Sequence, residues 1–127
     1  MKQQKHPDIP EDMYKEHILE LYKSKSNFGS LPKPEFQATR YNSICGDEIT
    51  VEVNVKNNKI KDIKFNGSGC VISLVASSLL TEKLKGMGLI EAKKLKAEEV
   101  LSMLKIKLNP ARMKCALLSF EAVKSAL

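Results

Sequence analysis

Residues 49–65 carry the pattern that most limits how this chain can fold. Apolar and polar side chains alternate from Ile49 to Lys56, which is typical of a half-buried strand. Asn57-Asn58 follows, and asparagine tolerates the positive φ of a two-residue hairpin turn. Ile60–Phe65 returns as the partner strand, with one slip in its alternation. The sequence therefore predicts an antiparallel hairpin, and residues 36–44 are a weaker candidate for a third strand.

Before and after these strands, apolar residues recur at the spacing of a helix. Proline with acidic residues favours a helix start near Pro10, and Asn27-Phe28-Gly29 favours its end. Asn109-Pro110 is an N-cap followed by proline at the first helical position. The helices expected are one from Pro10 up to Asn27, one from Cys70 to Leu84, one over Lys96–Ile106 and one from Pro110 to Leu127.

A run of strands followed by a run of helices predicts an α+β fold. We expect an N-terminal helix, a three-stranded antiparallel sheet, and then helices packed on one face of that sheet. The length of 127 residues corresponds to one domain, so residues 1–127 are predicted to form a single domain with a flexible tail over residues 1–9. A chain of this length builds a core without disulfides.

Composition argues against several functions. The net charge is +6, but only Arg40 and Arg112 among the 21 basic residues are arginine, and tryptophan is absent. This lysine-rich composition indicates a solvated surface rather than a nucleic-acid reader, so no nucleic-acid partner is expected. No apolar run approaches the roughly 20 residues of a membrane helix, and the polar N-terminus lacks a signal-peptide core. We expect a cytoplasmic protein that does not bind membranes.

The cysteines Cys45, Cys70 and Cys115 are the most informative residues. An odd number of cysteines without a signal peptide argues against a disulfide framework, and no pair forms a CxxC motif. Each cysteine lies where the chain is expected to change direction. In an antiparallel meander, the turn between the first two strands and the exit of the third strand meet at the same end of the sheet. Any site that the cysteines share must therefore be assembled by the fold.

Asp47 lies two residues after Cys45, so the fold can offer three thiolates and one carboxylate as ligands. Soft thiolates suit zinc, copper(I) or iron–sulfur species. The alternative is that the three cysteines fill the core, since free cysteine is among the most buried residue types. A helix N-terminus at Cys70, and Lys114 with Arg112 beside Cys115, would lower the thiol pKa and favour a nucleophilic thiolate.

Four segments in order resemble the U-type iron–sulfur cluster assembly scaffolds, the family of IscU, SufU and the NifU N-terminal domain. The resemblance extends over about residues 13–125. Three of the segments contain the cysteines, and the strand–helix background between them matches as well. The segments are Glu20-Leu21-Tyr22-Lys23 with Asn27 and Gly29, Cys45-Gly46-Asp47, Phe65–Ser73 and Arg112–Leu118.

The resemblance implies a SufE/NifU-like fold and a carrier rather than an enzyme. Members accept persulfide sulfur from a cysteine desulfurase, assemble a [2Fe–2S] cluster from iron and sulfur, and transfer it to apo acceptor proteins; Zn²⁺ binds at the same ligands. By motif match, the ligands for cluster or metal in this chain are Cys45, Asp47, Cys70 and Cys115. Three cysteines and one carboxylate can also be shared between two chains, so a monomer and a cluster-bridged homodimer are both open.

The chain combines features of two branches of this family. Lys114 before the third cysteine is similar to SufU and implies the alternative function, a zinc-dependent sulfurtransferase that accepts sulfur from a cysteine desulfurase and stimulates it. The interval of 45 positions between Cys70 and Cys115 is similar to IscU and favours the scaffold. The persulfide acceptor is expected to be Cys115 in an IscU-like site and Cys45 in a SufU-like site. Lys114 is then a candidate thiolate stabiliser or ligand.

One partner expected of IscU members is not expected here. Those members carry a Leu-Pro-Pro-Val-Lys segment that a dedicated Hsp70 chaperone reads. The equivalent segment of this chain is Leu108-Asn109-Pro110-Ala111-Arg112, which departs from that motif. The departure argues against the Hsp70 partnership.

Overall fold

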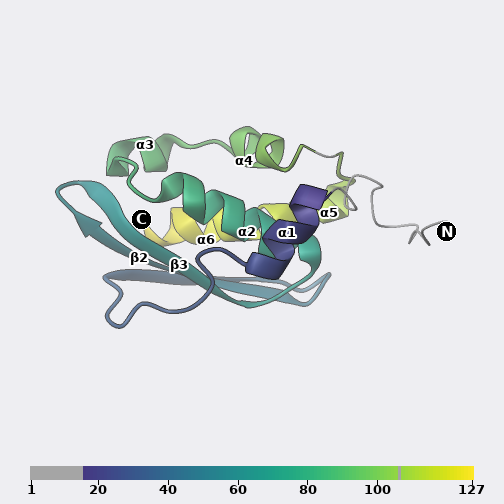
Figure 1. Cartoon of the computed structure of the whole chain (residues 1–127), viewed down its shortest axis with the longest axis horizontal. Coiled ribbons are helices and arrows are strands. Elements are labelled where there is room, and N and C mark those ends of the chain that lie inside the picture. Colours follow the sequence, from purple (N-terminus) through teal and green to yellow (C-terminus); the bar gives the residue numbers. More distant parts are fainter. Residues whose placement is uncertain (1–15, 106) are drawn as a thin grey trace.

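The computed structural model describes residues 16–105 and 107–127, and Figure 1 shows its arrangement. The predicted tail over residues 1–9 and the predicted helix start at Pro10 lie outside these residues. The elements in chain order are α1 (Glu16–Ser24), β1 (Phe36–Asn42), β2 (Asp47–Lys56), β3 (Lys59–Ser68), α2 (Val71–Leu84), α3 (Leu89–Lys94), α4 (Ala97–Leu104), α5 (Pro110–Ala116) and α6 (Leu118–Ala126).

The three strands form one antiparallel sheet in the order β1-β2-β3. Asn57 and Asn58 have φ values of +55° and +62°, so both adopt the left-handed conformation of a type I′ hairpin turn. The register shifts between Asn54 and Val55, which pair with Asp62 and Ile60. This bulge accounts for the slip in the apolar alternation of β3. The predicted hairpin is confirmed.

Helices cover one face of the sheet, as predicted (Figure 1). That face presents a row of fully buried apolar side chains on β2 and β3, against which α2 and α6 pack. The long helix α2 is buried over most of its 14 residues. The predicted α+β class is therefore confirmed. The buried sheet residues are Ile49, Val51, Val53, Ile60, Ile63 and Phe65.

Two irregular segments cover the outer edge of β3. Phe65 exchanges backbone hydrogen bonds with the segment Asn27–Gly29, at 2.8 Å to Gly29 N–H and 3.0 Å to the Asn27 carbonyl. Further along, Ile60 exchanges backbone hydrogen bonds with Gly86 and Met87. Pairing of this kind satisfies the open donors and acceptors of an edge strand. It also fixes the position of β3, whose far end leads into Cys70.

The helical part differs from the prediction in two places. The expected continuous C-terminal helix is divided at Leu117, where φ is −97° and ψ is 2°. The division lets α5 contact α2 and α4 while α6 packs on β1 and β2, so tertiary packing overrides the helical pattern of the sequence. The six-residue α3 was not predicted, because a helix of fewer than two turns shows no clear apolar periodicity.

Candidate metal centre

The turn between β1 and β2 presents Cys45 at one end of the sheet. Asn42 and Asp47 pair across this turn, and the Asn42 carbonyl accepts a hydrogen bond from Gly46 N–H at 2.7 Å. Gly46 has a φ of +75°, a conformation that glycine adopts at little cost. The side-chain oxygen of Asn42 also accepts a hydrogen bond from Ile44 N–H at 3.1 Å. These bonds order the turn and leave Cys45 exposed.

Asp47, the first residue of β2, lies buried against the start of α2. Its Oδ1 accepts a hydrogen bond from Cys70 N–H at 3.2 Å, and its Oδ2 accepts one from the Ser73 hydroxyl at 2.6 Å. The exposed fraction of Asp47 is 2%, and a carboxylate is tolerated in such a place only when donors replace water. Cys70 is the N-cap residue of α2, and its half-buried sulfur lies 3.8 Å from Asp47 Oδ2.

Helix α5 places Cys115 beside this turn. Asn109 caps α5, since its side-chain oxygen accepts a hydrogen bond from Arg112 N–H at 2.8 Å, and Pro110 occupies the first helical position. Both features were predicted. Cys115 is only 1% exposed, and its backbone carbonyl oxygen lies 3.2 Å from Ser73 Oγ. Helix α5 therefore carries a buried thiol in its last turn, and the backbone of that turn lies beside Ser73 near the start of α2.

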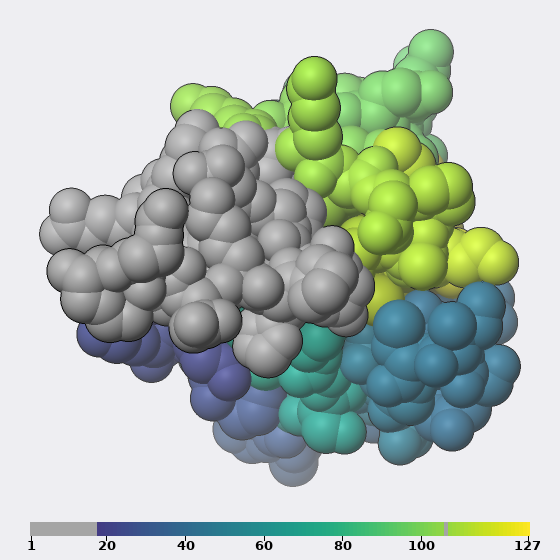
Figure 2. Space-filling view, turned by 90° about the vertical axis from the view of Figure 1, so that its right-hand side faces the viewer, coloured from purple at the N-terminus to yellow at the C-terminus, as the bar shows by residue number. Residues whose placement is uncertain are grey.

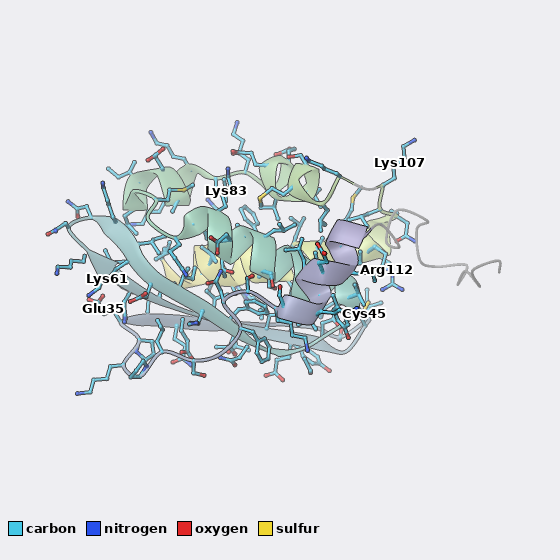
Figure 3. The ribbon with its side chains drawn as sticks, in the orientation of Figure 1. Glu35, Cys45, Lys61, Lys83, Lys107 and Arg112 are labelled. Carbon is cyan, nitrogen blue, oxygen red and sulfur yellow. The ribbon has the colours of Figure 1, made fainter. Side chains whose placement is uncertain are left out.

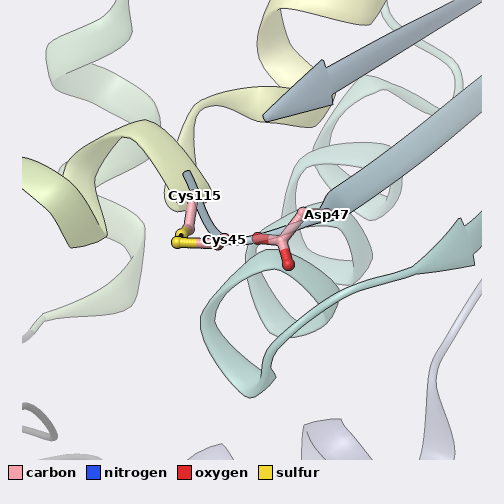
Figure 4. A group of neighbouring side chains, drawn as sticks. All are labelled: Cys45, Asp47 and Cys115. Atoms are coloured by element: carbon pink, nitrogen blue, oxygen red, sulfur yellow. Dashed lines mark hydrogen bonds between the residues drawn. The ribbon is translucent and has the colours of Figure 1, made fainter. Parts of the chain in front are cut away.

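The sulfur atoms of Cys45 and Cys115 lie 3.1 Å apart. Together with a carboxylate oxygen of Asp47 they form a group whose ligand atoms all lie within 4.8 Å of one another. Figure 4 shows the two sulfur atoms side by side, with the Asp47 carboxylate beyond them at the start of β2. Cys70 is outside this group of three but adjoins it through its contact with Asp47. The structure thus brings three of the four predicted ligands together and places the fourth beside the carboxylate.

Burial controls the ionisation of the Cys115 thiol. Loss of solvent raises its pKa far above that of an ordinary cysteine, and its hydrogen bond with Cys45 raises the pKa further. Burial therefore disfavours the thiolate form of Cys115. Lys114 is exposed to solvent while the Cys115 sulfur beside it is buried, so the expected effect of Lys114 and Arg112 on this pKa stays a prediction.

The candidate site lies at one end of the molecule, where the β1–β2 turn and α5 meet at the surface (Figure 2). Figure 3 places Cys45 and Arg112 at this end and Glu35 and Lys61 at the opposite end. Lys114 contributes to a hollow of about 260 Å³ that borders the site. The hollow is lined by Tyr41, Asn42, Ser43, Ile44, Lys114, Leu118 and Glu121.

Two residues that sequence reasoning missed organise the site. Ser73 binds the Asp47 carboxylate, and the side-chain amide of Asn42 lies 3.7 Å from the Cys115 sulfur. Ser73 follows Cys70 by three residues, which is one helical turn, so the i, i+3 spacing was the available signal. Asn42 gave no such signal, because its place depends on the strand register that pairs it with Asp47.

The donor set matches the chemistry of a metal or an iron–sulfur species. Thiolate sulfur and carboxylate oxygen are both ligands that zinc accepts, and thiolates are the usual ligands of iron–sulfur clusters.

Within the described residues, none of the helices combines the length and apolar character that crossing a membrane requires.

Comparisons with known proteins match nearly the whole chain. Residues 13–127 match the family model of the NifU-like N terminal domain. An iron–sulfur cluster assembly scaffold protein IscU from Thermotoga maritima is 38% identical, over 91% of this chain and 92% of that protein. An iron–sulfur cluster assembly enzyme IscU from Drosophila melanogaster is 34% identical, over 94% of this chain and 79% of that protein.

A solved structure gives the same result for the fold. It is a candidate iron–sulfur cluster assembly scaffold protein for the SUF system from Fervidobacterium islandicum, 28% identical with a TM-score of 0.73. The superposition covers 90% of this chain and 96% of that chain. The matched region includes all three cysteine segments of the candidate site. The chain therefore belongs to the NifU-like N-terminal domain family, the family of the U-type iron–sulfur cluster scaffolds.

Proposed function

We propose that this chain is an iron–sulfur cluster assembly scaffold and not an enzyme. In this proposal Cys45, Asp47, Cys70 and Cys115 hold a [2Fe–2S] cluster, which is then transferred to apo acceptor proteins. The observation that carries the proposal is the group of two sulfur atoms and one carboxylate oxygen within 4.8 Å of one another at an open end of the sheet. A closed structural zinc site lacks this access, whereas a cluster cargo needs it.

Sulfur enters the site as persulfide from a cysteine desulfurase. A thiolate of the scaffold attacks the outer sulfur of the desulfurase persulfide, a new sulfur–sulfur bond forms on the scaffold, and the desulfurase cysteine leaves as a thiolate. Cys45 suits this step because it is exposed, whereas burial of Cys115 restricts access to its sulfur and raises its pKa. We therefore assign the first persulfide to Cys45.

Apolar side chains around the turn support docking of a protein partner. Tyr41 and Ile44 are 64% and 67% exposed, and Met113 on α5 is 40% exposed. Exposed apolar side chains gathered near a reactive thiol favour contact with another protein. In this proposal the desulfurase and the apo acceptors dock at this end of the molecule.

Anaerobic reconstitution with ferrous iron, cysteine, a cysteine desulfurase and a thiol reductant tests the scaffold, because each persulfide sulfur must gain two electrons to join the cluster as sulfide. We expect two iron and two sulfide per cluster, with visible charge-transfer bands that disappear in Cys45→Ser, Cys70→Ser and Cys115→Ser. Omitting the desulfurase is the control for sulfide supply. Reconstituted protein that carries neither iron nor sulfide would contradict the proposal.

A zinc-dependent sulfurtransferase is the second candidate function. The observation that favours it is the exposure of Cys45 beside a buried Cys115, since an accessible thiol in a metal site suits sulfur transfer by ligand exchange. The lysine at position 114 and the similarity to the SUF-system structure agree with it. Retention of one zinc per chain without a cluster, together with faster desulfurase turnover, would favour this function over the scaffold.

A further inference from the structure

Ser73 contacts three of the four residues that the proposed function treats as ligands. Its hydroxyl oxygen lies 2.6 Å from Asp47 Oδ2, 3.2 Å from the backbone carbonyl oxygen of Cys115 and 3.8 Å from Cys70 Sγ. The side chain is 1% exposed, so water does not compete for these contacts. Ser73 is neither one of the four proposed ligands nor the proposed persulfide acceptor.

The single proton of the Ser73 hydroxyl goes to Asp47. The carboxylate is the stronger acceptor because it is charged, and its oxygen is the nearer of the two acceptors. The other carboxylate oxygen accepts the backbone N–H of Cys70 at 3.2 Å. The Ser73 hydroxyl on Oδ2 and the Cys70 N–H on Oδ1 fix the orientation of the carboxylate, and each oxygen keeps lone-pair capacity for a metal ion.

The packing around position 69 holds this arrangement in place. A Cβ atom on Gly69 would lie 3.0 Å from Ser73 Cβ and 3.3 Å from Asp47 Cγ. The loop backbone therefore closes directly over the hydrogen-bonded pair. This leaves the carboxylate in one position relative to the sulfur atoms of Cys45 and Cys115, within the group of ligand atoms that spans 4.8 Å.

We propose that Ser73 is a positioning residue of the metal centre, which orients the Asp47 carboxylate toward the metal ion that the cysteines bind. The inference rests on the proposed function, in which Asp47 is a ligand. Ligating carboxylates are commonly held by such hydrogen bonds, and loss of the partner weakens metal binding by about 10- to 100-fold. Ser73 thereby sets how tightly the oxygen ligand is engaged, while the thiolates supply the soft donors.

The test measures Zn²⁺ affinity by competition with a chelator and records the absorption spectrum of the Co²⁺-loaded protein. We expect Ser73→Ala to weaken Zn²⁺ binding by about tenfold and to change the Co²⁺ ligand-field bands. Ser77→Ala is the matched control, since Ser77 is also a buried hydroxyl of α2 but donates to the Ser73 carbonyl and contacts none of the ligands. We expect its Zn²⁺ affinity to stay within about twofold of wild type. Urea unfolding of each variant verifies that it is folded.

A double-mutant cycle separates positioning from a general structural effect. If Ser73 acts through Asp47, Ser73→Ala has no further effect on Zn²⁺ affinity in an Asp47→Ala background. An equal loss in both backgrounds, or no loss in Ser73→Ala alone, would overturn the inference. Unchanged Zn²⁺ affinity in Asp47→Ala itself would instead remove Asp47 from the proposed ligands, which is a failure of the proposed function.

Discussion

The sulfur atoms of Cys45 and Cys115 lie 3.1 Å apart, although 70 positions of the chain separate the two residues. The two thiols meet in unlike surroundings, because Cys45 is exposed on a turn and Cys115 is buried at the end of α5. Burial raises the pKa of Cys115. The pair therefore combines an accessible thiol with a buried thiol whose raised pKa disfavours the thiolate.

We predict that iodoacetamide alkylates Cys45 much faster than Cys115 at pH 7.5 in the presence of a metal chelator. The reactive species is the thiolate, and each unit by which burial raises the pKa of Cys115 lowers its thiolate fraction about tenfold. Burial also restricts access of the reagent to this sulfur. Mass spectrometry of peptides sampled over time measures both rates. Alkylation in denaturant is the control, in which we expect the two cysteines to react alike; equal rates in the folded protein would contradict the prediction.

The raised pKa of Cys115 also predicts how stability depends on pH. In the unfolded chain this thiol ionises near pH 8.5, whereas in the folded protein it ionises at higher pH. The folded state binds the proton more tightly, so this contribution to stability is complete below about pH 8.5 and is lost as the pH rises toward the folded pKa. The loss approaches about 1.4 kcal/mol per pH unit.

Urea unfolding at pH 7 and pH 10, in the presence of a chelator, measures this dependence. The matched control is Cys115→Ala, which lacks the titrating thiol. We expect wild type to lose more of its free energy of unfolding between the two pH values than the variant loses. An equal loss in both proteins would show that the ionisation of Cys115 does not differ between the folded and unfolded states.

The sheet could be predicted from the sequence because its signals are local. Alternation over Ile49–Lys56 sets the buried face, and Asn57-Asn58 sets the turn. The division of the last helix at Leu117 could not be predicted, because the residues on both sides keep helical spacing. Only the different packing partners of α5 and α6 require the division.

At the candidate site too, the sequence showed local features but not the contacts between elements that are distant in the chain. The positions of Cys45, Cys70 and Cys115 at changes of chain direction indicated a shared site, and the three-dimensional structure brings them to one end of the sheet. The burial of Cys115 was not predictable from its basic neighbours in sequence, because it depends on how α5 packs against α2. The contact of Ser73 with Asp47 likewise depends on the close approach of the two elements.

We predict that Asn109→Ala lowers the free energy of unfolding by about 1 kcal/mol. The substitution removes the side-chain oxygen that accepts Arg112 N–H at the start of α5. Asn109→Asp keeps an acceptor and adds a negative charge at the positive end of the helix, so we expect it to retain wild-type stability. Urea denaturation of the two variants measures the difference. A similar loss in both would show that the cap does not stabilise α5.

The exit of β3 gives a prediction about the backbone that leads into Cys70. Gly67 has a φ of +129°, and a Cβ atom there would lie 2.0 Å from the carbonyl oxygen of Glu48 on β2. Gly67→Ala must therefore both strain the backbone and push β2 and β3 apart next to Asp47. We expect it to lower the free energy of unfolding by more than about 2 kcal/mol, beyond the cost of about 1 kcal/mol for a positive φ alone.

Gly86→Ala is the matched control for Gly67→Ala. Gly86 also has a positive φ, +84°, but a Cβ atom there would meet nothing within 4 Å. We expect Gly86→Ala to lower the free energy of unfolding by about 1 kcal/mol, which is the cost of the backbone conformation alone. Its Zn²⁺ affinity should equal that of wild type, because Gly86 lies away from the ligands. Urea unfolding and Zn²⁺ competition on both variants measure the two effects. Equal destabilisation by the two substitutions would mean that the strands absorb the added methyl group and that the contact with Glu48 does not constrain the site.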